Sequence, residues 1–571
     1  MSKERHLRRS GARIMGNLIL LLGSLSYIMV LAVLNGTVGF LCAMGVPFMG
    51  ALGVVKAMGE PIPLSYGLIV TLAILFGVVR GLLRYVEQYS NHYIAFRLLA
   101  VIRDRIFEAL RKLCPAKLES KQKGAIIAMI TADIETLEVF YAHTISPICI
   151  ALIVSAFVVG FVSWISSPYL ALAAMLGFIL VGIVLPVRYS GSLKESGVAY
   201  RSAFSSFNAF FLDSIKGIKD IVLHNAGEAR KTRVNERSDA LLEQTRRTKR
   251  GVTRAMAQTE FCVSLILLAT LILGLLLVIH GRISSGRMIL GVVAVLGSFG
   301  PVLAISALPG DLTQTFASGD RVLNLLSEKP AVEPIEDGAD FDFEDLDVQH
   351  LSFAYDEKMP VLCDLNMRLK KGEIVGIVGD SGCGKSTFLK LLMRFWEKDA
   401  GKILYNGTDI DRVNTQSLLD HVTMVSQTTY LFDDTIEQNL RLAKPDATTE
   451  EIKEACQMAS VHDFILTLPE GYQTRVGTLG DRLSAGEKQR IGLARAFLRG
   501  SELILLDEPT SNVDAINEGI ILRALKAQKH KRSILLVSHR ESTMAIADRI
   551  YRVEGGKMIP WSQEGKKDGS D

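Results

Sequence analysis

The stretch GDSGCGKST, Gly379–Thr387, decides the fold of the C-terminal half of this 571-residue chain. It follows the apolar run Ile374–Val378 directly and precedes the helical stretch Phe388–Trp396. A loop of the pattern G-x-x-x-x-G-K-[ST] between a buried strand and a helix cradles nucleotide phosphates with its backbone N–H groups. Its lysine supplies positive charge and the following hydroxyl binds Mg²⁺. The predicted nucleotide-binding residues of the loop are Gly379, Asp380, Ser381, Gly382, Cys383, Gly384, Lys385, Ser386 and Thr387.

A second apolar strand, Leu503–Leu506, ends in the acidic pair Asp507 and Glu508. Beside a P-loop, one carboxylate of such a pair can hold the metal ion and the other can polarise an attacking water. We therefore assign Asp507 to the metal side of the site and Glu508 to the general base. The pair predicts hydrolysis of the bound nucleotide.

Apolar residues are concentrated before about residue 310, and they predict a membrane domain in the N-terminal half. Hydrophobic residues make up 49% of the chain and charged residues only 22%. A helix needs roughly 20 apolar residues to cross the hydrocarbon core of a bilayer, and six stretches approach or exceed that length. The predicted spans are Ile14–Val55, Ile62–Arg80, Thr144–Trp164, Tyr169–Val187, Phe261–Ile279 and Met288–Leu308.

Lysine and arginine gather in the N-terminal head and in two long connections, 97–123 and 188–254, whereas the loops 56–63 and 166–168 are nearly uncharged. Because basic loops stay on the cytoplasmic side, we expect both termini in the cytoplasm of a cell with a bacterial inner membrane. The two connections contain few helix breakers and predict helical arms about 45 Å long. The net charge of the whole chain, +4, is too small for a nucleic-acid-binding protein.

An acidic, proline-containing stretch separates the apolar half from the P-loop half. The fold class predicted is an α-helical six-span transmembrane domain with long cytoplasmic helical arms, followed by an α/β P-loop NTPase domain. We place the transmembrane domain at 1–327, the linker at 328–347, the nucleotide-binding domain at 348–560 and a flexible tail at 561–571.

Further motifs lie between and after the glycine-rich P-loop and the acidic pair. LSAGEKQR, Leu483–Arg490, lies between them, and SNVD, ending at Asp514, and the strand Ser533–Val537, leading to His539, follow them. With these motifs the chain resembles an ATP-binding cassette half-transporter of the exporter fold, in which the membrane domain and the cassette are fused. The resemblance covers nearly the whole chain and implies an ATPase coupled to movement of a substance across a membrane.

The resemblance also implies roles for single residues. Tyr355 is similar to the aromatic residue that stacks on adenine, Gln427 to the glutamine that meets both magnesium and the membrane domain, and His539 to the switch histidine. Ser484 and Gly486 are similar to the signature residues, which contact the γ-phosphate of the nucleotide held by the opposite subunit. A helix N-terminus such as the one after Ser484 is a favourable anion site, so the functional site is expected to be dimeric.

The complete predicted site follows from the motifs and the resemblance together. The cofactors are ATP and Mg²⁺. The catalytic residues are Glu508, His539, Lys385 and Gln427, and the metal ligands, partly through water, are Ser386, Gln427 and Asp507. Outside the P-loop, the nucleotide-binding residues are Tyr355, Gln427, Ser484, Gly486, Asp507 and Asp514.

The chain departs from the family's usual pattern near the signature. Ala485 stands where glycine is usual and Glu487 where glutamine is commoner, which predicts a slower site. The stretch Thr474–Gly480 lacks the acidic residues that exporters usually carry before the signature.

The segments Gly124–Glu138 and Phe210–Ile221 resemble the coupling helices at the tips of the two arms. On their residues alone, both segments are amphipathic helices with an apolar face to bury.

The stretch RYVEQYSNHYIAFRLL, Arg84–Leu99, resembles the subfamily tied to cytochrome bd assembly and thiol export, whose members pair as unlike subunits. Arg80, Arg84 and Glu87 lie on one polar helix face close to the membrane. Ionisable groups there are costly unless they face water or a partner. Two interpretations stay open: the three residues line a substrate cavity, or Arg84 and Glu87 form a pair at the membrane interface.

The sequence thus predicts an ATP-driven exporter subunit for a small-molecule substrate, embedded in the lipid bilayer with no nucleic-acid partner. An importer built on the exporter fold and an ATP-gated regulator without active transport are the alternatives. A second, unlike half-transporter is the favoured partner, and a homodimer is the other possibility.

Overall fold

The computed structural model describes residues 10–119, 123–306, 308–356, 359–477, 480, 482–511 and 513–561. Contacts divide the chain into two compact units. The membrane unit contains Leu7–Arg111 and Lys121–Glu328, and the cassette unit contains Lys329–Asp571 together with Lys112–Ser120. Nearly all of the predicted tail, 561–571, lies outside the described residues, as does most of the basic head.

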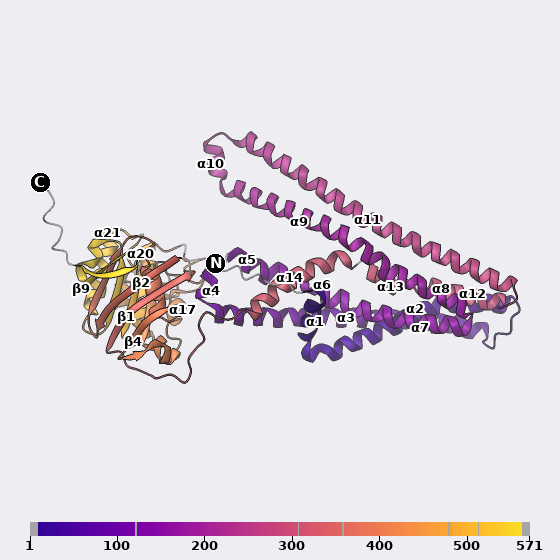
Figure 1. Ribbon diagram of the computed structural model, residues 1–571, viewed down its shortest axis with the longest axis horizontal. Helices are drawn as coiled ribbons and strands as arrows, with labels where there is room; N and C mark the ends of the chain where they lie inside the picture. Colours follow the sequence, from indigo (N-terminus) through magenta and orange to yellow (C-terminus); the bar gives the residue numbers. More distant parts are fainter. Residues whose placement is uncertain are drawn as a thin grey trace. The chain divides into compact units, whose positions relative to one another are not determined.

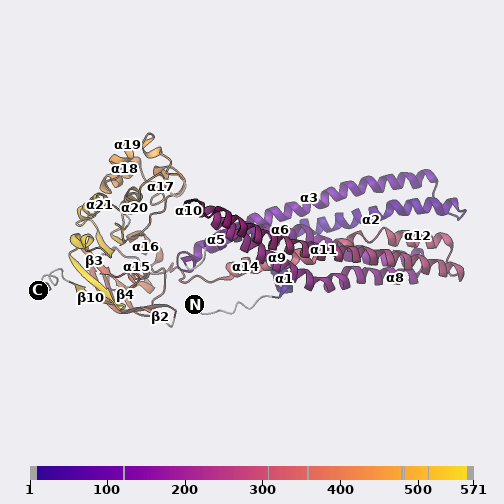
Figure 2. The ribbon, with the colours of Figure 1, turned by 90° about the horizontal axis from the view of Figure 1, so that it is seen from above.

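The described part of the membrane unit is built from helices (Figures 1 and 2). Three π-helical turns, η2 (Met129–Asp133), η3 (Tyr141–Ile145) and η4 (Leu180–Val184), interrupt its long helices. The α-helices are α1 (Gly11–Leu20), α2 (Ser26–Ala57), α3 (Tyr66–Leu113), α5 (Lys123–Ala128), α6 (Ile134–Phe140), α7 (Ser146–Ile165), α8 (Pro168–Ile179), α9 (Leu185–Lys216), α10 (Ile218–Leu223), α11 (Gly227–Ile279), α12 (Ser285–Leu296), α13 (Gly300–Ser306) and α14 (Pro309–Ser327).

Six of the described helical stretches are long and apolar enough to cross a membrane, which is the number that the sequence predicts. The first span is shorter than predicted, because the chain breaks after α1 and the spanning helix begins at Gly23. Each of the other five spans extends beyond at least one of its predicted ends, but the second begins at Tyr66, after the predicted Ile62, and the sixth ends at Ser306, before the predicted Leu308. The candidate spans are Gly23–Ala57, Tyr66–Leu113, Gly124–Ile165, Pro168–Lys216, Gly227–Ile279 and Ser285–Ser306.

Helices α9 and α11 lie side by side along their length, and α10 joins them at one end (Figures 1 and 2). At 1.5 Å per residue the 53 residues of α11 extend about 80 Å, far more than the roughly 30 Å of a hydrocarbon core. The predicted arm 188–254 is therefore helical. Two guanidinium groups of α11 pack on the ring of Phe210, with Arg230 at 3.9 Å and Arg237 at 4.1 Å from its centroid, and these contacts tie the two helices together near α10.

The prediction that Gly124–Glu138 forms the tip of the first arm is wrong. This segment lies inside the third spanning stretch, Gly124–Ile165, and belongs to the membrane unit. The turn comes earlier, because α3 ends at Leu113 and Pro115 follows, and proline cannot continue a helix there. The short helix α4 (Ala116–Glu119) belongs to the cassette unit, where Glu119 pairs with Lys390 at 2.7 Å.

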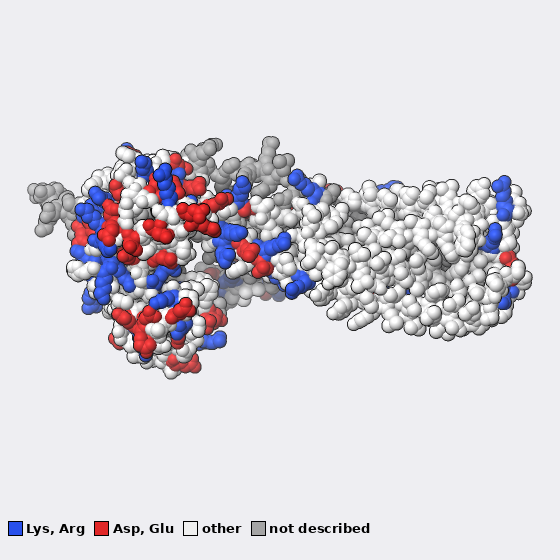
Figure 3. Space-filling model, turned by 90° about the horizontal axis from the view of Figure 1, so that it is seen from below, with Lys and Arg blue, Asp and Glu red and all other residues white. Residues whose placement is uncertain are grey.

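The visible face of the membrane unit carries a broad band with almost no charged side chains, and charged side chains lie beyond it on both sides (Figure 3). Such a band is the surface that a hydrocarbon core accepts. The six spans are buried to different extents. Of the most apolar 18-residue stretch of each span, only 6% is buried in α3 and 11% in α11, whereas 44% is buried in the span that contains α8. A single chain therefore leaves α3 and α11 largely uncovered.

The cassette unit contains two sheets. An antiparallel sheet has the strand order β2-β1-β4-β5, and a six-stranded, mostly parallel sheet has the order β10-β9-β3-β8-β7-β6. Strand β1 begins inside the predicted linker, at Asp345. The strands are β1 (Asp345–Asp356), β2 (Met359–Lys370), β3 (Ile374–Gly379), β4 (Ala400–Tyr405), β5 (Thr408–Asp409), β6 (Val422–Val425), β7 (Leu503–Asp507), β8 (Ser533–Ser538), β9 (Arg549–Glu554) and β10 (Lys557–Trp561).

Helices cover the larger sheet, and its buried strands read as continuous apolar runs, as parallel strands do. One core packs β3, β7 and β8 against the helices around α20 (Ala485–Arg499), and another packs the opposite side of these strands against the antiparallel sheet and α15 (Lys385–Leu392). Strand β8 pairs in parallel with both β3 and β7. The carboxyl ends of these strands therefore meet at one edge, which is where open α/β sheets bind ligands.

Candidate nucleotide-binding site

The P-loop leaves the carboxyl end of β3 and enters α15 at Lys385. Gly382 and Gly384 have φ values of +83° and +104°, a region that side chains rarely adopt. At Gly384 a Cβ atom would also lie 2.8 Å from Leu362 Cδ2. The Lys385 ammonium group donates to the carbonyl oxygens of Gly379 at 2.8 Å and Asp380 at 2.7 Å. The loop is thus folded round its own lysine, beside the N-terminus of α15.

Ser386 and Asp507 meet between the P-loop and the end of β7. The Ser386 hydroxyl donates to Asp507 Oδ1 at 2.9 Å. Burial raises the pKa of the Asp507 carboxyl, and the neighbouring charge of Glu508 raises it further, against the lowering effect of the Ser386 hydrogen bond. A buried carboxylate of this kind gains from a cation, and the hydroxyl and carboxylate oxygens are donors that suit Mg²⁺.

Glu508 lies close to two of the three other predicted catalytic side chains. Gln427 Nε2 donates to Glu508 Oε2 at 3.0 Å, and His539 Nδ1 lies 3.2 Å from Glu508 Oε1. The Glu508 backbone has φ +49°, unusual for a residue with a side chain, and its N–H donates to the carbonyl oxygen of Val537 on β8. The side chain is 16% exposed, so the carboxylate reaches the surface of the sheet edge.

Tyr355, the predicted adenine-stacking residue, lies next to Thr387 at the end of the P-loop. It is 46% exposed, and its hydroxyl lies 3.0 Å from Thr387 Oγ1. Its ring packs edge to face on Trp396, with 5.1 Å between ring centroids, and on Phe353, with 4.9 Å. The aromatic surface therefore borders the loop that the sequence predicts to hold the phosphates.

The predicted signature residues form a second group at the start of α20. Ser484 caps this helix in a capping box: its hydroxyl accepts from the Glu487 N–H, and the Glu487 carboxylate accepts from the Ser484 N–H at 2.7 Å. The Glu487 side chain thus places a negative charge at the positive end of the helix dipole. An incoming phosphate would meet that charge at the same helix N-terminus, which gives a physical reason for a slower site.

Gly486 and Asp514 are linked through one asparagine. Asp514 caps α21 (Ala515–Ala527) and accepts from the Asn517 side chain at 2.7 Å, and these hydrogen bonds lower the pKa of the Asp514 carboxyl. Asn517 also packs on Gly486, where a Cβ atom would lie 2.9 Å from Asn517 Cγ. A side chain at position 486 would displace the Asn517 side chain.

In the membrane unit the structure joins two of the three predicted cavity residues. Arg84 NH1 lies 2.8 Å from Glu87 Oε2, and the Arg84 side chain is 53% exposed whereas that of Glu87 is 3% exposed. Glu87 packs near Gly36 of α2, where a Cβ atom would lie 3.0 Å from Glu87 Cδ. Arg80 is exposed on the same helix. The carboxylate of the pair is buried and the guanidinium is half exposed, and the choice between a substrate cavity and a pair at the membrane interface stays a prediction.

Sequence reasoning missed several contacts of the site. The capping box of Ser484 and Glu487 was readable as S-x-x-E before a helix. The edge-to-face contact of Trp396 with Tyr355 and the packing of Asn517 on Gly486 join residues far apart in the chain, and no local pattern announces them. Two residues of the stretch Thr474–Gly480, at positions 478 and 479, lie outside the described residues.

A P-loop, an acidic strand end, a glutamine, a histidine and a signature helix, fused to six spanning helices, define an ABC half-transporter. Residues 362–511 match the family described as ABC transporter, and residues 25–302 match the ABC transporter transmembrane region. A Haemophilus influenzae ABC transporter ATP-binding/permease protein is 45% identical over 553 residues, which cover 97% of this chain and 100% of the relative.

Two further comparisons agree. The Bacillus subtilis protein YgaD, described as a multidrug export ATP-binding/permease protein, is 32% identical over 495 residues, which cover 85% of this chain and 84% of the relative. The solved structure of a bacterial Atm1-family ABC exporter with ATP bound has a TM-score of 0.77 at 22% identity, covers 94% of this chain and 95% of that chain, and shares the fold.

This chain belongs to the ABC transporter family. It is a multi-pass membrane protein and an ATP-binding half-transporter of the exporter fold, whose ATPase activity drives transport and whose architecture implies a dimer. These relatives do not favour the importer alternative. The subfamily resemblance at Arg84–Leu99 stays a prediction.

Proposed function

We propose that the chain is one half of a dimeric exporter for a small, largely apolar molecule, and that ATP is hydrolysed at Glu508. The observation that carries the assignment is the position of Glu508 between Gln427 at 3.0 Å and His539 at 3.2 Å, next to the Ser386–Asp507 contact. A general base needs both reach and partners that can turn towards the reacting groups. The experiment is a comparison of ATP binding and ATP hydrolysis in Glu508→Gln.

In the proposed reaction the water oxygen attacks the γ-phosphorus, and the bond from that phosphorus to the β,γ-bridging oxygen breaks. Glu508 orients the water and accepts its proton, and His539 and Gln427 hold Glu508 and contact the terminal phosphate. Lys385, whose ammonium group now donates to two carbonyl oxygens, turns to the phosphates and offsets their charge. ADP and inorganic phosphate leave.

The donor set at the sheet edge supports Mg²⁺ as cofactor. The Ser386 hydroxyl and the Asp507 carboxylate already touch, and Gln427 offers an amide oxygen. A hard cation prefers such oxygen donors together with phosphate oxygens and water. When bound, Mg²⁺ would neutralise charge that develops on the phosphate oxygens.

The signature group supports a site completed by a second cassette. Ser484, Gly486 and Asp514 gather around α20 and α21, and in the proposed dimer they face the nucleotide of the opposite subunit. The arm tip also needs a partner, because it carries an exposed apolar surface. Its large exposed apolar residues are Phe211, Leu212, Ile215, Ile218, Val222 and Leu223.

We favour a heterodimer with a second, unlike half-transporter over a homodimer. The support is the altered signature at Ala485 and Glu487, since two unlike subunits let one ATP site weaken while the other stays active. The test is the ATPase activity of this chain purified alone against the same chain co-expressed with a neighbouring half-transporter. A stable, substrate-stimulated dimer of this chain by itself would contradict the heterodimer.

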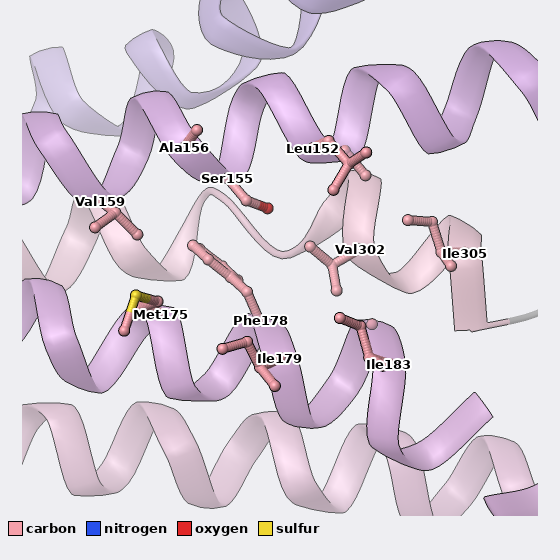
Figure 4. Close-up of a pocket in the computed structure, with 12 residues that line it drawn as sticks. Leu152, Ser155, Ala156, Val159, Met175, Phe178, Ile179, Ile183, Val302 and Ile305 are labelled. Atoms are coloured by element: carbon pink, nitrogen blue, oxygen red, sulfur yellow. The ribbon is translucent and has the colours of Figure 1, made fainter. Parts of the chain in front are cut away.

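The chemistry of one pocket supports an apolar substrate (Figure 4). Residues of α7, α8, η4 and α13 line an open groove of about 410 Å³, and Ser155 carries the one hydroxyl among the described lining residues. Leu152, Val159 and Met175 lie roughly 10–20 Å along their helices from the turn at Ser166, which is within the hydrocarbon core. YgaD is described as a multidrug exporter, which is in keeping with this chemistry.

The direction of transport is tested with inverted membrane vesicles. Export requires ATP-dependent uptake of an apolar dye into inside-out vesicles and no ATP-dependent uptake into right-side-out vesicles.

We propose a bacterial inner-membrane location with both termini in the cytoplasm, supported by the basic arms. A cysteine introduced in 56–63, in a chain without its native cysteines, should then react with an impermeant thiol reagent on intact cells.

We propose to keep the division into a transmembrane domain at 1–327, a linker at 328–347 and a cassette at 348–560. Its support is the end of α14 at Ser327 and the start of β1 at Asp345.

A further inference from the structure

A buried glutamate that the site described above does not use lies directly behind the predicted switch histidine. Glu518 is on the first turns of α21 and is 9% exposed. A carboxylate at such a position is costly to bury unless hydrogen bonds satisfy it. Three described side chains donate to it, and these three come from the segment that follows His539.

The Glu518 carboxylate holds three side chains of that segment. Arg540 NH1 donates to Glu518 Oε2 at 2.8 Å, the Ser542 hydroxyl donates to Oε1 at 2.9 Å, and the Thr543 hydroxyl donates to Oε1 at 3.2 Å. Arg540 is the residue next to His539, and its backbone N–H donates to the Ser538 hydroxyl at 3.0 Å. The turn that carries the histidine is therefore fixed on both sides of the imidazole.

The same network reaches the strand end that carries the general base. Thr543 Oγ1 lies 3.2 Å from Thr510 Oγ1, and Thr510 follows Glu508 by one intervening proline. Thr510 and Thr543 are both fully buried. Movement of the 540–543 turn would therefore change the position of His539 relative to Glu508, which now stand 3.2 Å apart.

We propose that Glu518 is the positioning residue for His539: its carboxylate fixes the Arg540–Thr543 turn so that the imidazole faces Glu508 and the terminal phosphate. The inference rests on the role proposed above for His539. Glu518 does not touch the nucleotide in this account, and its effect passes through the turn. Misplacing a catalytic group by about 1 Å can cost up to 100-fold in rate without loss of binding.

The test is the variant Glu518→Gln in the full-length transporter in lipid. Glutamine has the same shape but no charge to hold the Arg540 guanidinium. We expect kcat for ATP to fall about tenfold, with KM, nucleotide affinity and Tm unchanged. Arg523→Gln, an exposed change on the same helix, is the matched control and should leave kcat unchanged.

A cycle with Arg540→Gln separates positioning from general stability. If Glu518 and Arg540 act as one unit, the double variant should be no slower than either single variant, and Glu518→Asp should recover part of the rate. Additive losses with a lowered Tm would overturn the proposal, and so would a normal kcat in Glu518→Gln. If that variant does not fold, Ser542→Ala removes one contact and should lower kcat about twofold, and a normal rate there counts against the proposal.

The variant His539→Ala distinguishes the two levels of the account. If it hydrolyses ATP at a near-normal rate, the proposed role of His539 fails and the inference fails with it. If His539→Ala is inactive and Glu518→Gln has a normal kcat, only the positioning role is wrong.

Discussion

Two glutamates of this chain, Glu508 and Glu87, each have a basic side chain within hydrogen-bonding reach, but their surroundings differ. Glu508 lies at the edge of a sheet, 16% exposed, with neutral or weakly basic partners in Gln427 and His539. Glu87 is 3% exposed among helices of the membrane unit, and its partner Arg84 is a permanent cation. Glu508 can exchange partners when a nucleotide arrives. Separation of Glu87 from Arg84 would instead leave a buried carboxylate without a partner of opposite charge.

The comparison indicates that the surroundings of a carboxylate decide whether it takes part in the reaction or stabilises the fold. Around Glu508 each neighbour can contact a reactant, because the strands end at an open edge. Around Glu87 the polar neighbours are enclosed: Thr37 and Asn91 are buried, and one oxygen of each has no hydrogen-bond partner within the described part of the chain. We therefore expect Glu508 to control rate and Glu87 to control stability.

The largest expected effect is on rate at Glu508. Glu508→Gln keeps the shape of the side chain but cannot accept the proton of water, so ATP hydrolysis should fall by about two orders of magnitude or more while ATP still binds. Equilibrium binding and steady-state turnover of the purified transporter check this. Lys385→Ala is the companion variant and should lose binding itself. Near-normal turnover in Glu508→Gln would mean that another group is the base.

A loss of stability is expected at Glu87. Glu87→Ala removes the carboxylate that pairs with Arg84 and empties space next to α2, so unfolding in lipid or detergent should be easier by about 1–2 kcal/mol. Basal and substrate-stimulated ATPase should fall together. Arg84→Ala should cost at least as much, because it leaves the buried Glu87 carboxylate without its cation. Normal stability with selective loss of substrate stimulation would instead make this pair part of a substrate cavity.

Asp507→Asn is expected to stabilise the cassette while it abolishes hydrolysis. Because burial raises the pKa of Asp507, the folded chain binds a proton more tightly there than the unfolded chain does. The ionised carboxylate thus destabilises the fold at pH 7, and this cost disappears as the pH falls through the raised pKa. Tm of the nucleotide-free protein should rise in Asp507→Asn at pH 7, and the gain should shrink towards pH 4. A lower Tm at pH 7 would contradict the assignment.

The smallest effect is expected at the signature. Glu487→Gln removes a negative charge from the N-terminus of α20 and keeps an acceptor for the capping box, so ATPase should rise about twofold to fivefold, the factor of a 0.3–1 kcal/mol dipole interaction. Steady-state ATPase of the assembled transporter measures it. Glu487→Ala, which also loses the cap, is the control for helix stability. A rate that falls in Glu487→Gln would show that the carboxylate assists the site.

Features of the structure that depend on a local sequence pattern were predicted, and features that depend on distant contacts were not. The P-loop, the Asp507–Glu508 pair and the six spans are set by local patterns, since strand, loop and helix are adjacent and apolar length alone marks a span. The first arm was misplaced because Gly124–Glu138 is as amphipathic as a docking helix, and the real turn depends on a single proline. The anchoring of the 540–543 turn by Glu518 joins distant segments, and only the fold brings them together.

The central claim is that the ATP site of this chain is completed by a second cassette. The most direct measurement is ATP hydrolysis in nanodiscs that hold either one copy of this chain or this chain together with a second half-transporter, each compared per intact P-loop. The account predicts negligible turnover with a single chain and full turnover once a second signature, from an unlike half-transporter or another copy, shares the disc. Full turnover by one isolated chain, abolished by Glu508→Gln, would contradict the composite site.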